Sequence, residues 1–281
     1  MEIHKPKPVH SWRELLTEIG VVVIGVSIAL AAEQTVEWLH WRNQVLEAKK
    51  VLASELAYNV RIAIWRMRTA TCVERRLDEL AAVLDTAAKT GSLPPVGDIA
   101  TPQRSYWLDY AWDSVVASQT AAHFPGQQLA DITLVYKVIS SQGERIVEEA
   151  AAWQSLYAMV GPGRRLDAAS EARLRESLSQ ARTLNRLIAA ASNSIAVRAN
   201  KLGLSFSAAD LELIAQGKHR PLQPAHDPNA TLLNTFGTPF GSICAPMGGA
   251  PPLYGQGYYE AVPSLIDDAV KDLPDYAGKA P

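Results

Sequence analysis

The feature that most constrains this chain is a stretch from Trp12 to Thr90 that contains no proline. Proline inside a helix removes a backbone donor and clashes with the preceding turn, and here Pro8 and Pro94 stand outside the stretch. Its only glycines, Gly20 and Gly25, lie in an apolar segment near its start. We therefore predict a membrane helix that continues directly into a long amphipathic helix.

The apolar segment from Ile19 to Ala32 contains only apolar or small residues. A helix needs roughly 20 residues to cross a bilayer, so the predicted transmembrane helix is extended to residues 15–37, after a tail of residues 1–14. Tryptophans that can anchor a helix at the two membrane interfaces stand at both ends of it: Trp12, Trp38 and Trp41. The favoured interpretation is a signal-anchor helix.

Two other interpretations of this segment remain open. Ala29-Leu30-Ala31 has the small-x-small form of a signal-peptidase site, which would make the segment a cleaved signal peptide. Against cleavage, Glu14 and Glu18 adjoin the apolar core, and the helical pattern continues through the cut. A buried core helix is the third interpretation, although fourteen consecutive apolar residues are many for a half-buried helix.

The orientation of the membrane helix is weakly determined by charge. Basic residues flank it equally, with Lys5, Lys7 and Arg13 before it and Arg42, Lys49 and Lys50 after it. A short tail followed by a large domain favours an inside N-terminus. We expect a single-pass protein of the bacterial inner membrane with a periplasmic C-terminal domain, because no second apolar stretch has spanning length.

Small residues within the apolar segment predict a surface for packing against another membrane helix. Such residues let two helix backbones approach closely in lipid. The residues concerned are Gly20, Gly25, Ser27 and Ala29. Ordinary apolar composition explains them equally well, so docking through this surface stays a hypothesis.

Beyond the membrane, apolar residues recur every three or four positions in successive segments, which predicts helices with one buried stripe each. Gly91 is expected to cap the first helix, and Gly143 is expected to allow close approach of a neighbouring helix. The further helices are expected over residues 105–122, 129–160, 167–202 and 207–217, the last closed by Gly217. The predicted fold is all-α, an antiparallel helical bundle over residues 38–217 with coiled-coil-like seams.

From residue 218 to 281 prolines and glycines alternate with aromatic residues. We expect an irregular arm along the bundle and a short helix near residues 264–272. The two cysteines, Cys72 and Cys244, would join this arm to the long helix if the domain lies in an oxidising compartment. Two unpaired thiols are the alternative.

Two motifs carry a resemblance. The first is Glu18–Leu30, with Trp38, Arg42 and the pattern Leu52-x-x-Glu55-Leu56-x-x-Asn59; the second is Ala111-Trp112-Asp113-Ser114-Val115-Val116-Ala117-Ser118. Through these two motifs, the first 160 residues or so resemble a group of uncharacterised bacterial single-pass membrane proteins with helical extramembrane domains. The resemblance implies an anchored helical domain and no activity.

Motifs for catalysis and cofactor binding are missing from the sequence. No His-x-x-x-His pair, phosphate-binding glycine loop or Gly-x-Ser-x-Gly elbow occurs, so we predict no enzyme, no cofactor and no metal. His219, His226 and Asp227 are the best metal candidate, although a plain polar loop explains them better. A net charge of −2 gives no basic field for nucleic acid.

These observations favour a membrane-anchored interaction or scaffold protein. It would contact the lipid bilayer, and it would dock on a larger membrane assembly as an accessory subunit or associate with itself, through the membrane helix and the long helix. The alternative is a ligand-binding or sensory bundle with an aromatic pocket lined by Trp112, Tyr136, Trp153 and Tyr157.

Overall fold

The computed structural model describes residues 12–219, 242–244, 247 and 267–276. These residues form an all-α bundle with one small two-stranded sheet, which confirms the predicted fold class. The elements in order are α1 (Trp12–Thr90), β1 (Ser92–Leu93), α2 (Tyr110–Ala117), the 3₁₀ turn η1 (Thr120–His123), α3 (Gly126–Leu156), η2 (Tyr157–Met159), β2 (Arg164–Arg165), α4 (Ala168–Ala199), α5 (Ala208–His219) and η3 (Ser242–Cys244).

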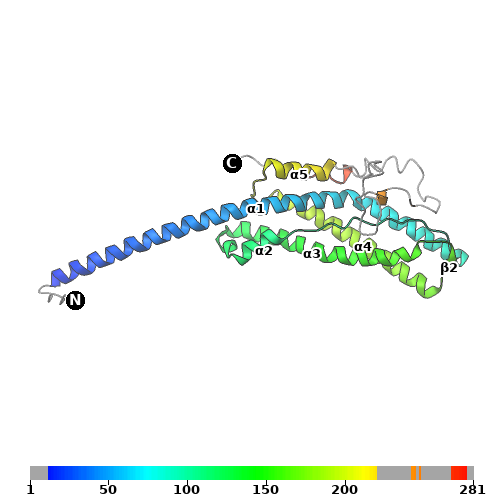
Figure 1. Ribbon diagram of the computed structural model, residues 1–281, viewed down its shortest axis with the longest axis horizontal. Coiled ribbons are helices and arrows are strands. Elements are labelled where there is room, and N and C mark those ends of the chain that lie inside the picture. The colour runs from blue at the N-terminus through cyan, green and yellow to red at the C-terminus, as the bar shows by residue number, and fades with distance from the viewer. Residues whose placement is uncertain (1–11, 220–241, 245–246, 248–266, 277–281) are drawn as a thin grey trace, which may run out of the picture.

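Helix α1 is one continuous helix of 79 residues. At 1.5 Å per residue it is about 120 Å long, and its N-terminal part extends away from the rest of the molecule as a single rod (Figure 1). Gly91 ends it in a left-handed conformation, φ 68°, and donates its N–H to the carbonyl of Ala87 at 2.8 Å. The expected uninterrupted helix and its glycine cap are therefore confirmed.

The bundle is built from the C-terminal part of α1 together with α3 and α4. Helix α4 runs antiparallel to both of the others, as expected. Helices α1 and α3 run parallel, because the chain after Gly91 returns along the bundle without a long helix before α3 begins (Figure 1). Their C-terminal ends are joined where β1 pairs with β2, Ser92 opposite Arg165.

The core follows a strict heptad spacing on α3 and α4. One row of buried residues on α3 consists of Ile132, Val135, Ile139, Gln142, Ile146, Glu149, Trp153 and Leu156, and Tyr136 and Ala152 are buried beside it. The corresponding row on α4 consists of Leu174, Leu178, Ala181, Asn185, Ile188, Ser192, Ile195 and Ala199, and Leu184 and Ala196 are buried beside it. Steps of three and four alternate along each row, which is typical of knobs-into-holes packing.

The predicted helix over residues 105–122 is much shorter in the structure. Helix α2 begins only at Tyr110, and η1 replaces its last turns after Gln119, whose φ of 62° breaks the helix. Upstream, Asn59 of α1 donates its Nδ2 to the carbonyl of Leu108 at 2.7 Å and accepts the Leu108 N–H at 2.9 Å. The Asn59 side chain forms hydrogen bonds with both the N–H and the carbonyl of Leu108, so these groups do not bond within a helix. A tertiary contact therefore overrides the local helical pattern.

The glycine predictions need two corrections. A Cβ at Gly143 would meet nothing within 4 Å, and Gln142 takes the buried position instead, so the predicted close approach there is wrong. Gly217 does not close α5, which continues to His219. It is the point of contact between helices, because a Cβ there would lie 2.9 Å from the backbone oxygen of Arg61 on α1.

The described parts of the C-terminal arm pack on the bundle. Ile243 joins the core beside the C-terminal third of α1, and Tyr276 donates its hydroxyl to the carbonyl of Ala196 on α4 at 2.7 Å. Of the predicted helix over residues 264–272, only 267–272 are described, and there the chain makes a short helical turn. The remainder of the arm lies outside the described residues.

Candidate functional sites

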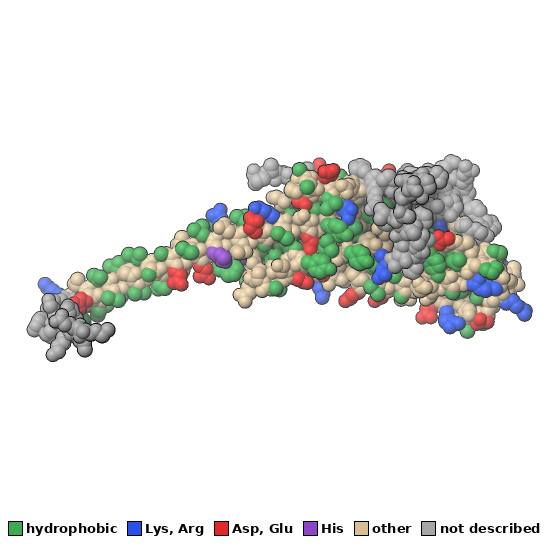
Figure 2. Space-filling model, in the orientation of Figure 1, with side chains coloured by type: hydrophobic (Ala, Val, Ile, Leu, Met, Phe, Trp, Pro, Cys, Tyr) green, Lys and Arg blue, Asp and Glu red, His purple; other side chains and the backbone are tan. Residues whose placement is uncertain are grey.

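The apolar N-terminal part of α1 lies on the surface. Figure 2 shows hydrophobic side chains along the rod that projects from the bundle. Within the described residues, α1 is the one helix long and apolar enough to cross a membrane, and none of its apolar window is buried. Val21 is 66% exposed and Ile28 is 65% exposed. A surface of this kind is costly in water and favourable in lipid.

The small residues of this segment form two surfaces rather than one. At 100° per residue, Gly25 and Ala29 lie about 40° apart on the helix, whereas Gly20 and Ser27 lie together on roughly the opposite side. A Cβ at Gly20 or at Gly25 would meet nothing within 4 Å. Both surfaces are therefore open to another helix.

The predicted interfacial tryptophans differ in their surroundings. Trp12 and Trp38 are exposed, 72% and 58%, whereas Trp41 is partly covered because its ring stacks on His123 of η1 with centroids 3.9 Å apart. A groove of about 310 Å³ opens at this point between α1 and η1. Its lining consists of Trp38, Trp41, Arg42, Val45, Leu46, Lys49, His123 and Pro125.

Helix α2 is held in place by the Leu-x-x-Glu-Leu-x-x-Asn pattern of α1 on which the resemblance rests. The carboxylate of Glu55 accepts the backbone N–H of Ala111 at 2.9 Å, at the N-terminus of α2, where no side chain of α2 itself provides a cap. One turn later Asn59 holds Leu108. The two sequence motifs named above therefore contact each other, and together they fix η1 and His123 against Trp41.

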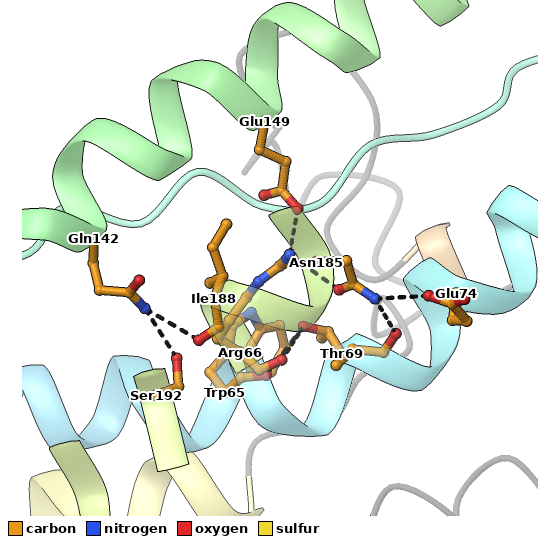
Figure 3. Close-up of polar contacts among 10 residues, drawn as sticks. Trp65, Arg66, Thr69, Glu74, Gln142, Glu149, Asn185, Ile188 and Ser192 are labelled. Carbon is orange, nitrogen blue, oxygen red and sulfur yellow. Dashed lines mark hydrogen bonds and ion pairs between the residues drawn. The ribbon is translucent and has the colours of Figure 1, made fainter. Parts of the chain in front are cut away.

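A buried polar layer crosses the centre of the bundle (Figure 3). Arg66 of α1 donates to the carboxylate of Glu149 on α3, and it also donates to Oδ1 of Asn185 on α4 at 3.2 Å. All three side chains are nearly fully buried. Burial raises the pKa of the Glu149 carboxyl, and the charge of Arg66 opposes that shift. Each of the three helices thus contributes one polar group at the same level.

A second polar contact lies seven residues away on α3 and on α4. Gln142 donates its Nε2 to the carbonyl of Ile188 at 3.1 Å and to the hydroxyl of Ser192 at 3.4 Å (Figure 3). If these core positions were all apolar, α3 could shift along α4 by a heptad and still bury apolar side chains. The paired polar groups meet their partners only when the two helices are aligned as they are here. We therefore expect the two layers to favour one register of the bundle.

The sequence-predicted cysteine pair is joined in the structure. Cys72 on α1 and Cys244 in η3 form a disulfide across 172 positions of sequence. Arg75, buried on the same side of α1, donates to the carbonyls of Ile243 at 2.7 Å and Cys244 at 3.1 Å. The short segment 242–244 is thus attached to α1 by a covalent bond and by two charge-assisted hydrogen bonds.

The four aromatic residues proposed to line a pocket are separated into two pairs. Trp112 stacks on Tyr136 at 5.5 Å in the core near α2, whereas Trp153 and Tyr157 belong to a different cluster near β1. The described cavity beside Trp153 and Glu149 measures about 10 Å³. That volume suits one water molecule and not a ligand.

Metal ligands are not gathered in the described part of the chain. No group of three or more His, Cys, Asp or Glu side chains there is placed to hold an ion. Of the weak candidate set, His226 and Asp227 lie outside the described residues.

Comparison of the chain with protein-family models, with curated proteins and with solved structures gives no match. The resemblance drawn from the α1 and α2 motifs therefore stays a prediction.

The residues of the polar layer were not anticipated from the sequence. Arg66, Glu149 and Asn185 fall outside the predicted apolar stripes, because those stripes follow apolar residues only. A strict heptad register extended through polar residues places all three at core positions. His123 had no such signal, because its contact with Trp41 depends on the position of α2.

Proposed function

We propose that this chain is a membrane-anchored interaction protein, in which residues 15–37 of α1 cross the bilayer and the bundle stands on the membrane as a rigid scaffold. The exposed apolar rod carries the proposal. A soluble bundle would leave this surface in water, and the described bundle has no groove that covers it.

The unbroken α1 supports a scaffolding role. Because one helix continues from the apolar segment into the bundle core, any tilt or rotation of the segment within the membrane moves the core directly. The polar layers and the disulfide hold the other helices in register with it. We propose that the chain docks on another membrane protein, or on a second copy of itself, through the small-residue surfaces of α1.

Extraction of membranes with alkaline carbonate tests the anchor, since peripheral proteins are released and spanning proteins stay. We expect the chain to remain in the pellet at its full length, without cleavage after Ala31. Alkaline phosphatase fused to the C-terminus tests the orientation; we expect the fusion to be active, which requires a periplasmic domain. Release by carbonate, or a mature chain that begins near Ala32, would refute the anchor.

Cross-linking in native membranes tests the docking. We expect Gly25→Leu to reduce cross-linked species, because a large side chain separates the helices at a small-residue surface. Ile19→Leu, about 80° or more around the helix from every residue of both small-residue surfaces, is the control and should leave them unchanged. Migration as a lone monomer in native gels, without any cross-linked species, would contradict docking.

The described bundle core does not contain the aromatic pocket on which the alternative of a ligand-binding or sensory bundle depends. The four aromatic residues on which that hypothesis depended do not share a cavity, and the cavity next to Trp153 has room for about one water.

A further inference from the structure

The groove between α1 and η1 lies at the depth of lipid headgroups if α1 spans the membrane as proposed above. Trp41 and Arg42 lie four and five residues beyond residue 37, which is about 6–8 Å along the helix at 1.5 Å per residue. Each headgroup layer is roughly 5–7 Å thick, from the difference between the full bilayer and its hydrocarbon core. The mouth of the groove, at Trp41 and Arg42, therefore coincides with the layer of phosphates. The backbone of Lys49 lies about 18 Å along the helix from residue 37, and its long side chain reaches back toward that layer because helical side chains lean toward the N-terminus.

The charged groups that line the groove have one sign. Arg42, Lys49 and His123 are the polar side chains among its described lining residues, and none of those lining residues is acidic. Glu37, one turn earlier on α1, accepts a hydrogen bond from Nε1 of Trp41 at 3.4 Å, and Glu47 is paired with Lys50 outside the groove. The groove is thus complementary to an anion with an apolar body, because tryptophan and aliphatic side chains form the rest of its wall.

Aromatic rings, and not carboxylates, position these cations. The guanidinium carbon of Arg42 lies 5.3 Å from the centre of the Trp38 ring, Nζ of Lys49 lies 5.8 Å from the Phe124 ring, and His123 stacks on Trp41. None of the described ion pairs includes Arg42 or Lys49. Lys50, the next residue, lies outside the groove and is paired with Glu47 at 2.7 Å. The groove keeps its donors available for an incoming anion.

We propose that this groove binds the phosphate of an anionic phospholipid from the leaflet next to the bundle. Arg42 and Lys49 would contact the phosphate, His123 would donate a further hydrogen bond, and Trp38 and Trp41 would pack against the glycerol region. The site includes η1, which Glu55 and Asn59 hold in place through α2. Bound lipid therefore joins the membrane surface to the fold of the bundle.

Native mass spectrometry of the full chain released from nanodiscs tests the site. The nanodiscs contain equal amounts of phosphatidylcholine and phosphatidylglycerol. We expect phosphatidylglycerol to predominate among retained lipids, and Lys49→Gln or Arg42→Gln to reduce that preference about fivefold each, from roughly 1 kcal/mol per basic residue at a membrane surface. Lys50→Gln removes the same charge from the neighbouring position and should leave the preference unchanged.

Each other outcome overturns the proposal in a recognisable way. Equal retention of both lipids by a carbonate-resistant chain would refute the site and leave the anchor intact. An equal loss in Lys49→Gln and Lys50→Gln would show general surface charge and no groove. Retention of inorganic phosphate by the detergent-solubilised chain, to the same extent as lipid, would identify a free anion. Release of the chain by carbonate would refute the anchor and this site together.

Discussion

The guanidinium of Arg66 on α1 donates to the carboxylate of Glu149 on α3 in the interior of the bundle, where both side chains are almost fully buried. The two residues are 83 positions apart in sequence. Charges so far from water are stable only when they are paired and hydrogen-bonded. Asn185 of α4 completes the arrangement, so the pair couples all three helices of the core.

Removal of one charge from this pair should destabilise the fold strongly. We expect Glu149→Gln to lower the free energy of unfolding by about 3–5 kcal/mol, because Arg66 then keeps a buried charge without a counter-ion. Urea denaturation in detergent, followed by circular dichroism, measures it. Glu148→Gln, at the exposed neighbouring position, is the control and should change stability by less than about 0.5 kcal/mol. Equal stability of the two variants would contradict the assignment.

Replacement of both charges should recover most of that loss. We expect Arg66→Met with Glu149→Leu to be more stable than Glu149→Gln alone, because no ion then remains in the core. If the layer specifies register, the double variant should show weaker near-ultraviolet circular dichroism despite its stability. A sharp native signal in the double variant would show that the layer does not determine register.

The pH dependence of stability should contain a contribution from Glu55. Burial raises the pKa of its carboxyl above the ordinary value of 4.5, although the hydrogen bond from Ala111 opposes the shift. Between 4.5 and the raised pKa the folded state binds more protons than the unfolded state. The contribution of Glu55 to stability is therefore present below pH 4.5 and is lost as the pH rises through the folded pKa.

Urea midpoints from pH 4 to pH 8 check this sign. We expect Glu55→Gln to flatten part of the decline with rising pH, since the variant does not titrate. Glu47→Gln, at an exposed position on the same helix, should follow the wild-type curve. A Glu55→Gln curve that declines as steeply as wild type would show that the carboxyl is not perturbed by burial.

Sequence periodicity was sufficient to predict the helices and the class of fold. The proline-free stretch became α1, Gly91 ends it, and Asp167 caps α4 by accepting the N–H of Ser170 at 2.9 Å. These are local effects, in which a residue acts within one turn of its own position. Local chemistry of this kind can be recognised without knowledge of the neighbours.

The candidate sites depend on contacts between distant residues, which the sequence pattern did not reveal. The shortening of α2 follows from Asn59, which is 49 positions away from Leu108. The parallel course of α1 and α3 follows from the return segment between them, and that course brings Glu149 opposite Arg66. Polar residues such as Gln142 and Glu149 occupy heptad positions of the core, but a stripe defined by apolar residues alone does not include them.

The disulfide between Cys72 and Cys244 should contribute strongly to global stability. A link that closes a loop of 172 positions removes about 5 kcal/mol of chain entropy from the unfolded state in the polymer model. We expect a loss of up to that amount in the double variant Cys72→Ser with Cys244→Ser. The variant should also be insensitive to reductant, whereas the wild type should be destabilised by it.

Intact mass spectrometry decides the redox state directly. The oxidised chain should be two hydrogens lighter than the reduced chain. Because Arg75 also holds the carbonyls of Ile243 and Cys244, we expect amide exchange near these residues to rise in the double variant but to rise further when Arg75→Met is added. An unchanged mass on reduction would show that the thiols are free in the purified protein.

The docking of α5 on α1 depends on the absence of a side chain at Gly217. A Cβ there would lie 2.9 Å from the carbonyl oxygen of Arg61 and 3.3 Å from Cβ of Ile64, and the backbone of α1 cannot yield as a flexible side chain would. We expect Gly217→Ala to destabilise the fold by about 1–3 kcal/mol through this overlap.

Gly143→Ala is the matched control on α3, where a Cβ meets nothing within 4 Å. There we expect a gain of about 0.5–1 kcal/mol, because alanine is the better helix former. Urea midpoints of opposite sign for the two substitutions would support the close contact. A stabilising effect of Gly217→Ala would mean that α5 does not pack on α1 at this distance.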